Sequence, residues 1–123
     1  MKLLLTFLLL ATVAAAAFAA DTASLTGKWQ IHTSAAGNES KYSCTFTQKE
    51  SDLTGSCSPE RGVVQINGKV EGSAVRWTYK SDYNGSPLTV TFKGTLDSTG
   101  KISGSVVAEE FGVEGEFSAT PEK

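Results

Sequence analysis

The chain has 123 residues, with 11 Lys and Arg against 13 Asp and Glu, which gives a formal net charge of −2 at pH 7. This length suits a single domain behind a short leader. The mild acidity, with basic residues scattered along the sequence, argues against a nucleic-acid partner, which would favour a basic face.

The first 19 residues have the features of a cleavable signal peptide. Lys2 supplies a positive start, a long apolar stretch follows, and Ala17-Phe18-Ala19 matches the small-x-small pattern of a cleavage site. We expect cleavage after Ala19, and therefore a secreted or periplasmic protein. A retained membrane anchor is disfavoured, because the apolar run is short for a span and ends in a cleavage pattern. After cleavage we expect no membrane partner.

Beyond the leader the sequence predicts strands and no helix. No apolar spacing of three and four persists for ten residues, whereas Gly, Thr, Ser and Val are frequent. Asn84-Gly85 is the strongest hairpin signal, because a type I′ turn needs a positive φ at both positions. After an N-terminal tail over 20–26, the expected strands cover 27–34, 40–48, 53–58, 63–70, 75–83, 86–96, 102–108 and 113–120.

Pairing these strands as successive hairpins keeps one apolar face in register. Around Asn84-Gly85, Trp77 faces Phe92 and Tyr79 faces Val90, all on one side. The same inner face runs through five strands without a register slip. We therefore expect an all-β fold: a single eight-stranded antiparallel up-and-down (meander) barrel over residues 27–121.

Two cysteines in an exported chain are most simply a disulfide. If Gln48 and Leu53 close the second hairpin, Cys44 and Cys57 lie directly opposite each other. Directly opposed residues of a non-hydrogen-bonded pair bring their Cβ atoms close enough to bridge. A redox role is disfavoured, because the spacing is not Cys-x-x-Cys and no cationic helix start lies nearby.

The segment Ser24-Leu25-Thr26-Gly27-Lys28-Trp29 resembles the first strand of avidin-type proteins, and Gly-x-Trp is also the opening signature of lipocalins. Both families are eight-stranded up-and-down barrels of the calycin kind, so the resemblance implies a lipocalin-like or avidin-like scaffold with Trp29 plugging a closed end. Shorter similarities to avidin strands occur at Leu53-Thr54-Gly55-Ser56, Val75-Arg76-Trp77, Phe92-Lys93-Gly94 and Phe117-Ser118-Ala119-Thr120.

The departures from the avidin pattern exclude its ligand. Avidins carry an Asn two residues after the first-strand Trp and a Ser six residues after it, and both contact biotin. Ile31 and Ala35 stand at these positions here, and Cys57 replaces a biotin-binding Tyr. A site that binds its ligand through polar side chains no longer binds it when those side chains are replaced. The resemblance therefore implies a shared scaffold without biotin recognition.

The inner-face aromatics are the ligand-like feature of the sequence, and two interpretations stay open. They form either a filled core or a pocket for a small apolar or ring-containing molecule. The tyrosines are the better candidates, because buried hydroxyls need partners. The candidate ligand-binding residues are Tyr42, Trp77, Tyr79, Tyr83, Phe92 and Phe117. Any mouth should lie where loops 35–39, 58–62, 84–85 and 109–112 meet.

No catalytic or metal-binding constellation is apparent. His32 is alone, without a second His or a Cys to complete a metal site. Glu109, Glu110, Glu114 and Glu116 form an acidic cluster, which we interpret as solvated charge rather than a calcium site or a hydrolytic pair. We therefore expect a protein that is not an enzyme and that needs neither a cofactor nor a metal.

The leading hypothesis is an exported, non-enzymatic barrel that binds a small apolar or aromatic molecule. The alternative is a secreted protein-binding module, such as a protease inhibitor acting through loops or its N-terminal tail. Small exported barrels with one disulfide and a Gly-x-Trp first strand include inhibitors of bacterial metalloproteases, whose N-terminal tail enters the target. Residues 20–24 would be the corresponding tail here.

Overall fold

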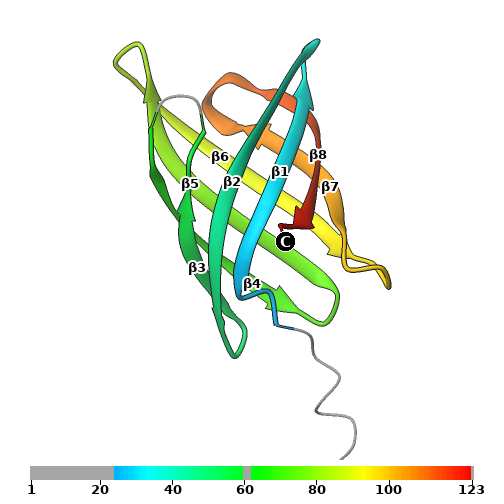
Figure 1. Cartoon of the computed structure of the whole chain (residues 1–123). Helices are drawn as coiled ribbons and strands as arrows, with labels where there is room; N and C mark the ends of the chain where they lie inside the picture. The colour runs from blue at the N-terminus through cyan, green and yellow to red at the C-terminus, as the bar shows by residue number, and fades with distance from the viewer. Residues whose placement is uncertain (1–23, 60–61, 123) are drawn as a thin grey trace, which may run out of the picture.

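The computed structural model describes residues 24–59 and 62–122, which form a closed antiparallel barrel (Figure 1). The strands are β1 (Gly27–Ala35), β2 (Asn38–Lys49), β3 (Asp52–Cys57), β4 (Val64–Glu71), β5 (Ala74–Tyr83), β6 (Ser86–Leu96), β7 (Ile102–Ala108) and β8 (Val113–Pro121). Each strand pairs with the next, and β8 returns to β1. The predicted single eight-stranded up-and-down barrel is therefore confirmed. Within the described residues, no helix is long and apolar enough to cross a membrane.

The predicted strand register is also confirmed. Trp77 pairs with Phe92 and Tyr79 with Val90, while Cys44 pairs with Cys57. The hairpin signals fix these pairings, and the alternation of side chains then carries every apolar set to the inside. The observed strand bounds differ from the expected ones by at most two residues, at the β1–β2 turn.

One short helix departs from the expectation of strands alone. It is η2 (Glu109–Phe111), a single 3-10 turn between β7 and β8 that ends at Gly112 with a φ of 66°. Thr89 donates its backbone N–H and its hydroxyl to the Glu110 carboxylate, at 2.6 and 2.7 Å. Thr91 Oγ1 donates to Glu109 at 2.6 Å. A turn of three residues is too short to show helical periodicity, so the sequence pattern does not predict it.

The barrel is closed at the end where the chain enters it. Leu25 is 1% exposed, and its carbonyl oxygen accepts a hydrogen bond of 2.8 Å from Trp29 Nε1. Its backbone N–H donates to Gln48 Oε1 at 2.9 Å. The expected tail over 20–26 therefore packs against the barrel from Leu25 onward. The proposed signal peptide, its cleavage site and residues 20–23 lie outside the described residues.

The middle of the barrel is filled by aromatic rings. Trp77 stacks on Phe92 with ring centroids 4.9 Å apart and an interplanar angle of 14°. Phe117 meets both rings edge to face, at 5.3 and 5.1 Å. Phe46 contacts Trp77 from the side of β2, at 5.0 Å. Such pairs add stability beyond the burial of their surface, so this cluster is the packing centre of the fold.

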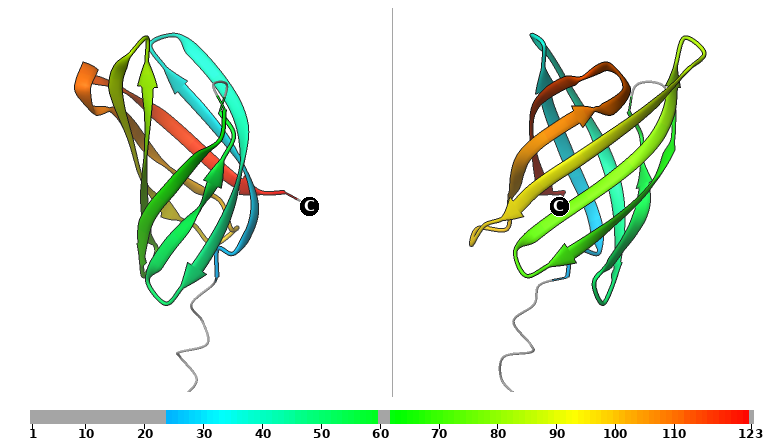
Figure 2. Two further views of the ribbon diagram at one scale, coloured as in Figure 1. Left: turned by 90° about the vertical axis from the view of Figure 1, so that its left-hand side faces the viewer. Right: turned by 180° about the vertical axis from the view of Figure 1, so that it is seen from behind.

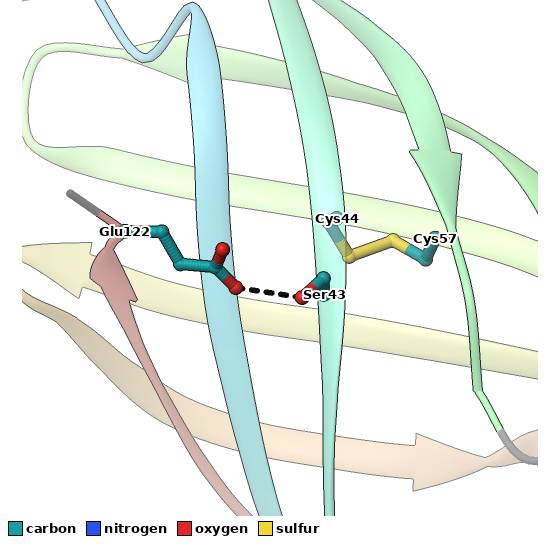
Figure 3. The surroundings of a disulfide bond; sticks show 4 residues. All are labelled: Ser43, Cys44, Cys57 and Glu122. Atoms are coloured by element: carbon teal, nitrogen blue, oxygen red, sulfur yellow. Dashed lines mark hydrogen bonds between the residues drawn. A yellow bond between two sulfur atoms is a disulfide. The ribbon is translucent and has the colours of Figure 1, made fainter.

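The predicted disulfide joins Cys44 of β2 to Cys57 of β3, and both residues are buried (Figure 3). A structural disulfide is typical of proteins that mature in an oxidising, extracytoplasmic compartment. On the neighbouring outer surface, Ser43 Oγ donates a hydrogen bond of 2.6 Å to Glu122 (Figure 3). That bond reaches across β1 and ties the end of the chain to β2.

Removing the disulfide should destabilise the barrel measurably. The bond links residues 13 apart in sequence. A disulfide that closes a loop of this size stabilises the folded state by about 3 kcal/mol. We expect Cys44→Ala with Cys57→Ala to lower the free energy of unfolding by about that amount in urea denaturation. A reductant should lower the stability of the wild type and leave the double variant unchanged. An equal response of both proteins to the reductant would contradict the prediction.

Candidate functional site

A cavity of about 470 Å³ lies at the end of the barrel opposite Leu25, within the connections β1–β2, β3–β4, β5–β6 and β7–β8 (upper end in Figure 1). This is the end at which the sequence predicts a mouth. Its walls are inward-facing side chains of six strands: Thr33, Ala35, Ser40, Tyr42, Val64, Tyr79, Ser81, Leu88, Val90, Phe92 and Val106. Glu39, Lys41, Ser58, Pro59 and Gly62 complete the lining at the rim.

The lower part of the cavity is apolar. Phe92, Val90 and Val106 line it and are themselves buried. Phe92 in turn rests on Trp77, so the floor of the cavity is the top of the aromatic core. A rigid, ring-lined floor of this kind favours apolar or ring-containing ligands, because contact there removes apolar surface from water.

Two tyrosines place polar groups in the cavity. Tyr42 comes from β2 and Tyr79 from β5, and neither hydroxyl makes a hydrogen bond to another described residue. Because both side chains line the open cavity, their hydroxyls can bond with water or with a bound molecule. The pair is therefore placed to donate to, or accept from, a polar group on a bound molecule.

Both tyrosines are held in the neutral form. Burial raises the pKa of Tyr42 far above its ordinary value, and the electrostatic effect of Tyr79 raises it further. Burial also raises the pKa of Tyr79. Desolvation disfavours the phenolate, so the cavity presents two uncharged hydroxyls at any physiological pH. Its charged side chains, Glu39 and Lys41, stand at the rim.

The six predicted ligand-binding residues divide into three groups. Tyr42, Tyr79 and Phe92 line the cavity. Trp77 and Phe117 lie beneath it and are buried in the aromatic core. Trp77 Nε1 is buried and lacks a hydrogen-bond partner in the described part of the chain.

Tyr83 forms the third group. It is 48% exposed and meets Phe111 edge to face at 6.0 Å. Alternation along β5 places Tyr83 on the inward-facing side of the strand. The β5–β6 hairpin projects beyond the barrel wall, however, so at this position there is no barrel interior for the side chain to face (Figures 1 and 2). Tyr83 is accordingly a side chain of the outer rim and does not line the cavity.

Sequence reasoning missed the hydroxyls of Thr33, Ser40 and Ser81. These residues occupy inward-facing positions near the ends of β1, β2 and β5, and all three line the cavity. The signal that identifies them is a change from apolar to polar residues at inward positions, at the same end of three strands. A filled barrel has no reason to place hydroxyls there, so that pattern marks where the core stops.

The described residues contain no grouping of three or more His, Cys, Asp or Glu placed to hold a metal ion. His32 lies on the outside and pairs with Glu39, with Nε2 3.1 Å from the carboxylate. Glu114 and Glu116 are exposed, as expected for solvated charges. No buried charged side chain occurs among the described residues.

No protein-family model matches this chain, and neither a curated protein nor a solved structure shows significant similarity to it.

Proposed function

We propose that this protein is an exported, non-enzymatic calycin-like barrel that carries a small, uncharged, ring-containing molecule in its mouth. The observation that supports this most strongly is the pair of tyrosines, Tyr42 and Tyr79, that line the cavity above an apolar floor. The ligand's ring would rest on Phe92, and its polar substituent would meet the hydroxyls. Neutral tyrosines, together with the lack of a buried charge among residues 24–59 and 62–122, favour an uncharged ligand, because burying an unpaired charge is costly.

The first test is native mass spectrometry of the mature protein purified from its own host. A retained mass of a few hundred daltons, on the order expected for a ligand of such a cavity, supports the proposal and identifies the ligand. The mass of the polypeptide itself tests the expected cleavage after Ala19. A bare chain that also fails to bind neutral aromatic probes would contradict the proposal and direct attention to the protein-binding alternative.

Removal of both hydroxyls should weaken the binding of a polar aromatic and spare an apolar one. We expect Tyr42→Phe with Tyr79→Phe to weaken 2-naphthol binding by roughly 5- to 100-fold, since each lost hydrogen bond is worth about 0.5–1.5 kcal/mol. Naphthalene, which makes no hydrogen bond, should bind both proteins equally. Fluorescence titration measures both affinities.

The matched control is Tyr83→Phe, which deletes the same hydroxyl outside the cavity. It should bind 2-naphthol as the wild type does. If Tyr83→Phe weakens binding as much as the double variant, or if naphthalene and 2-naphthol respond alike, the tyrosine pair does not select the ligand.

A further inference from the structure

The outer face of β4, β5 and β6 carries three cations directly opposite one another. Lys69 pairs in register with Arg76, and Arg76 pairs with Lys93. All three are exposed. The right-hand view of Figure 2 faces this side of the barrel, where β5 and β6 run side by side. Directly opposed like charges repel, so this row works against the stability of the sheet.

Little inside the described part of the chain neutralises the row. Lys69 Nζ lies 2.6 Å from Asp52 Oδ1, whereas Arg76 and Lys93 form no ion pair with a described residue. The chain as a whole is acidic, with a net charge of −2, so the row is a local concentration of positive charge. A hollow of about 220 Å³ lies along it, lined by Lys69, Arg76 and Lys93 together with Glu71, Ala74, Val75 and Gly94.

The rest of this face is mainly polar. The next positions along the strands bring Asn67 opposite Thr78. Gln65 and Lys80 line the same hollow as this pair. On the β7 side the face ends where the carboxylates of η2 bind the threonines of β6. Of the large apolar side chains that are exposed in the described residues, Val63 borders this face beside Gln65. The others are Tyr83, Phe111 and Val113.

We propose that this face binds an acidic polysaccharide, a chain of sugars that carry carboxylate or sulfate groups. The cation row would make charge-assisted hydrogen bonds to the anionic groups, with Arg76 able to bind two oxygens at once. Asn67, Thr78 and Gln65 both donate and accept, as sugar hydroxyls do. A stable protein interface has an apolar core, and single-stranded nucleic acid needs aromatic stacking platforms. The face offers neither.

Affinity electrophoresis of the mature protein tests this inference. The probes are polygalacturonate and dextran sulfate, with neutral dextran and duplex DNA for comparison. We expect retardation by the two acidic polysaccharides that falls as salt is added, because exposed charges are screened. Arg76→Gln with Lys93→Gln should weaken binding by about tenfold or more, since it removes two charge-assisted contacts. Its melting temperature should not fall, because the substitutions relieve like-charge repulsion.

The matched control, Lys28→Gln with Lys101→Gln, makes the same change in net charge on β1 and on the β6–β7 turn. It should bind as the wild type does. Equal weakening by the control, equal affinity for duplex DNA, or no retardation by either acidic polysaccharide would overturn the inference. Binding should persist in the Tyr42→Phe with Tyr79→Phe variant, so this inference and the proposed function can fail separately.

Discussion

Gly104→Ala should destabilise the barrel by about 3 kcal/mol or more, a large share of the stability of a small domain. Gly104 of β7 lies directly opposite Gly94 of β6. A Cβ at Gly104 would overlap the carbonyl oxygen of Lys93 and would lie 2.5 Å from the Cα of Gly94. Both obstacles belong to the backbone of the neighbouring strand, so the clash is relieved only if β6 and β7 separate.

Urea denaturation of Gly104→Ala beside Ser103→Ala measures this effect. Ser103 is the preceding residue of β7 and faces outward, so its substitution should change the free energy of unfolding by no more than about 0.5 kcal/mol. Failure of Gly104→Ala to fold at all, with Ser103→Ala intact, agrees with the prediction. Equal stability of the two variants would show that β6 and β7 tolerate a methyl group where Gly94 and Gly104 pair, and would contradict the prediction.

The register of the barrel could be predicted from the sequence because each hairpin signal constrains the next. Once Asn84-Gly85 sets the pairing of β5 with β6, a slip of one residue would turn either Trp77 or Phe92 outward. The same logic places Cys44 opposite Cys57 from the second hairpin alone. Register is therefore a property that alternation and turn chemistry determine locally.

Depth along the barrel could not be predicted in the same way. Alternation separates inside from outside, but it does not distinguish the middle of the barrel from its mouth. Trp77 and Tyr79 share a face of β5, yet one lies in the aromatic core and the other lines the cavity. Tyr83 is on the same face of β5, but it lies at the tip of a hairpin that extends beyond the barrel wall and is exposed there. That difference depends on strand tilt and on how far each hairpin extends past its neighbours.

The second change with a large expected effect is at Phe92, because this ring belongs both to the core and to the floor of the cavity. Phe92 contacts Trp77, Phe117 and Tyr79. We expect Phe92→Ala to lower the free energy of unfolding by about 4 kcal/mol, the usual loss for a buried Phe. The melting temperature should fall by roughly 15–30 °C. Circular dichroism melts measure the effect.

Phe111→Ala makes the same chemical change at a ring that is 49% exposed, so it should lower stability by less than about 1 kcal/mol. Phe92→Ala also removes the barrier between the cavity and Trp77, and an apolar void of this kind accepts small apolar molecules. Benzene should therefore raise the melting temperature of Phe92→Ala more than that of the wild type, because it binds only the folded state. If Phe92→Ala and Phe111→Ala were equally stable and benzene acted on neither, the ring stack would not be the packing centre.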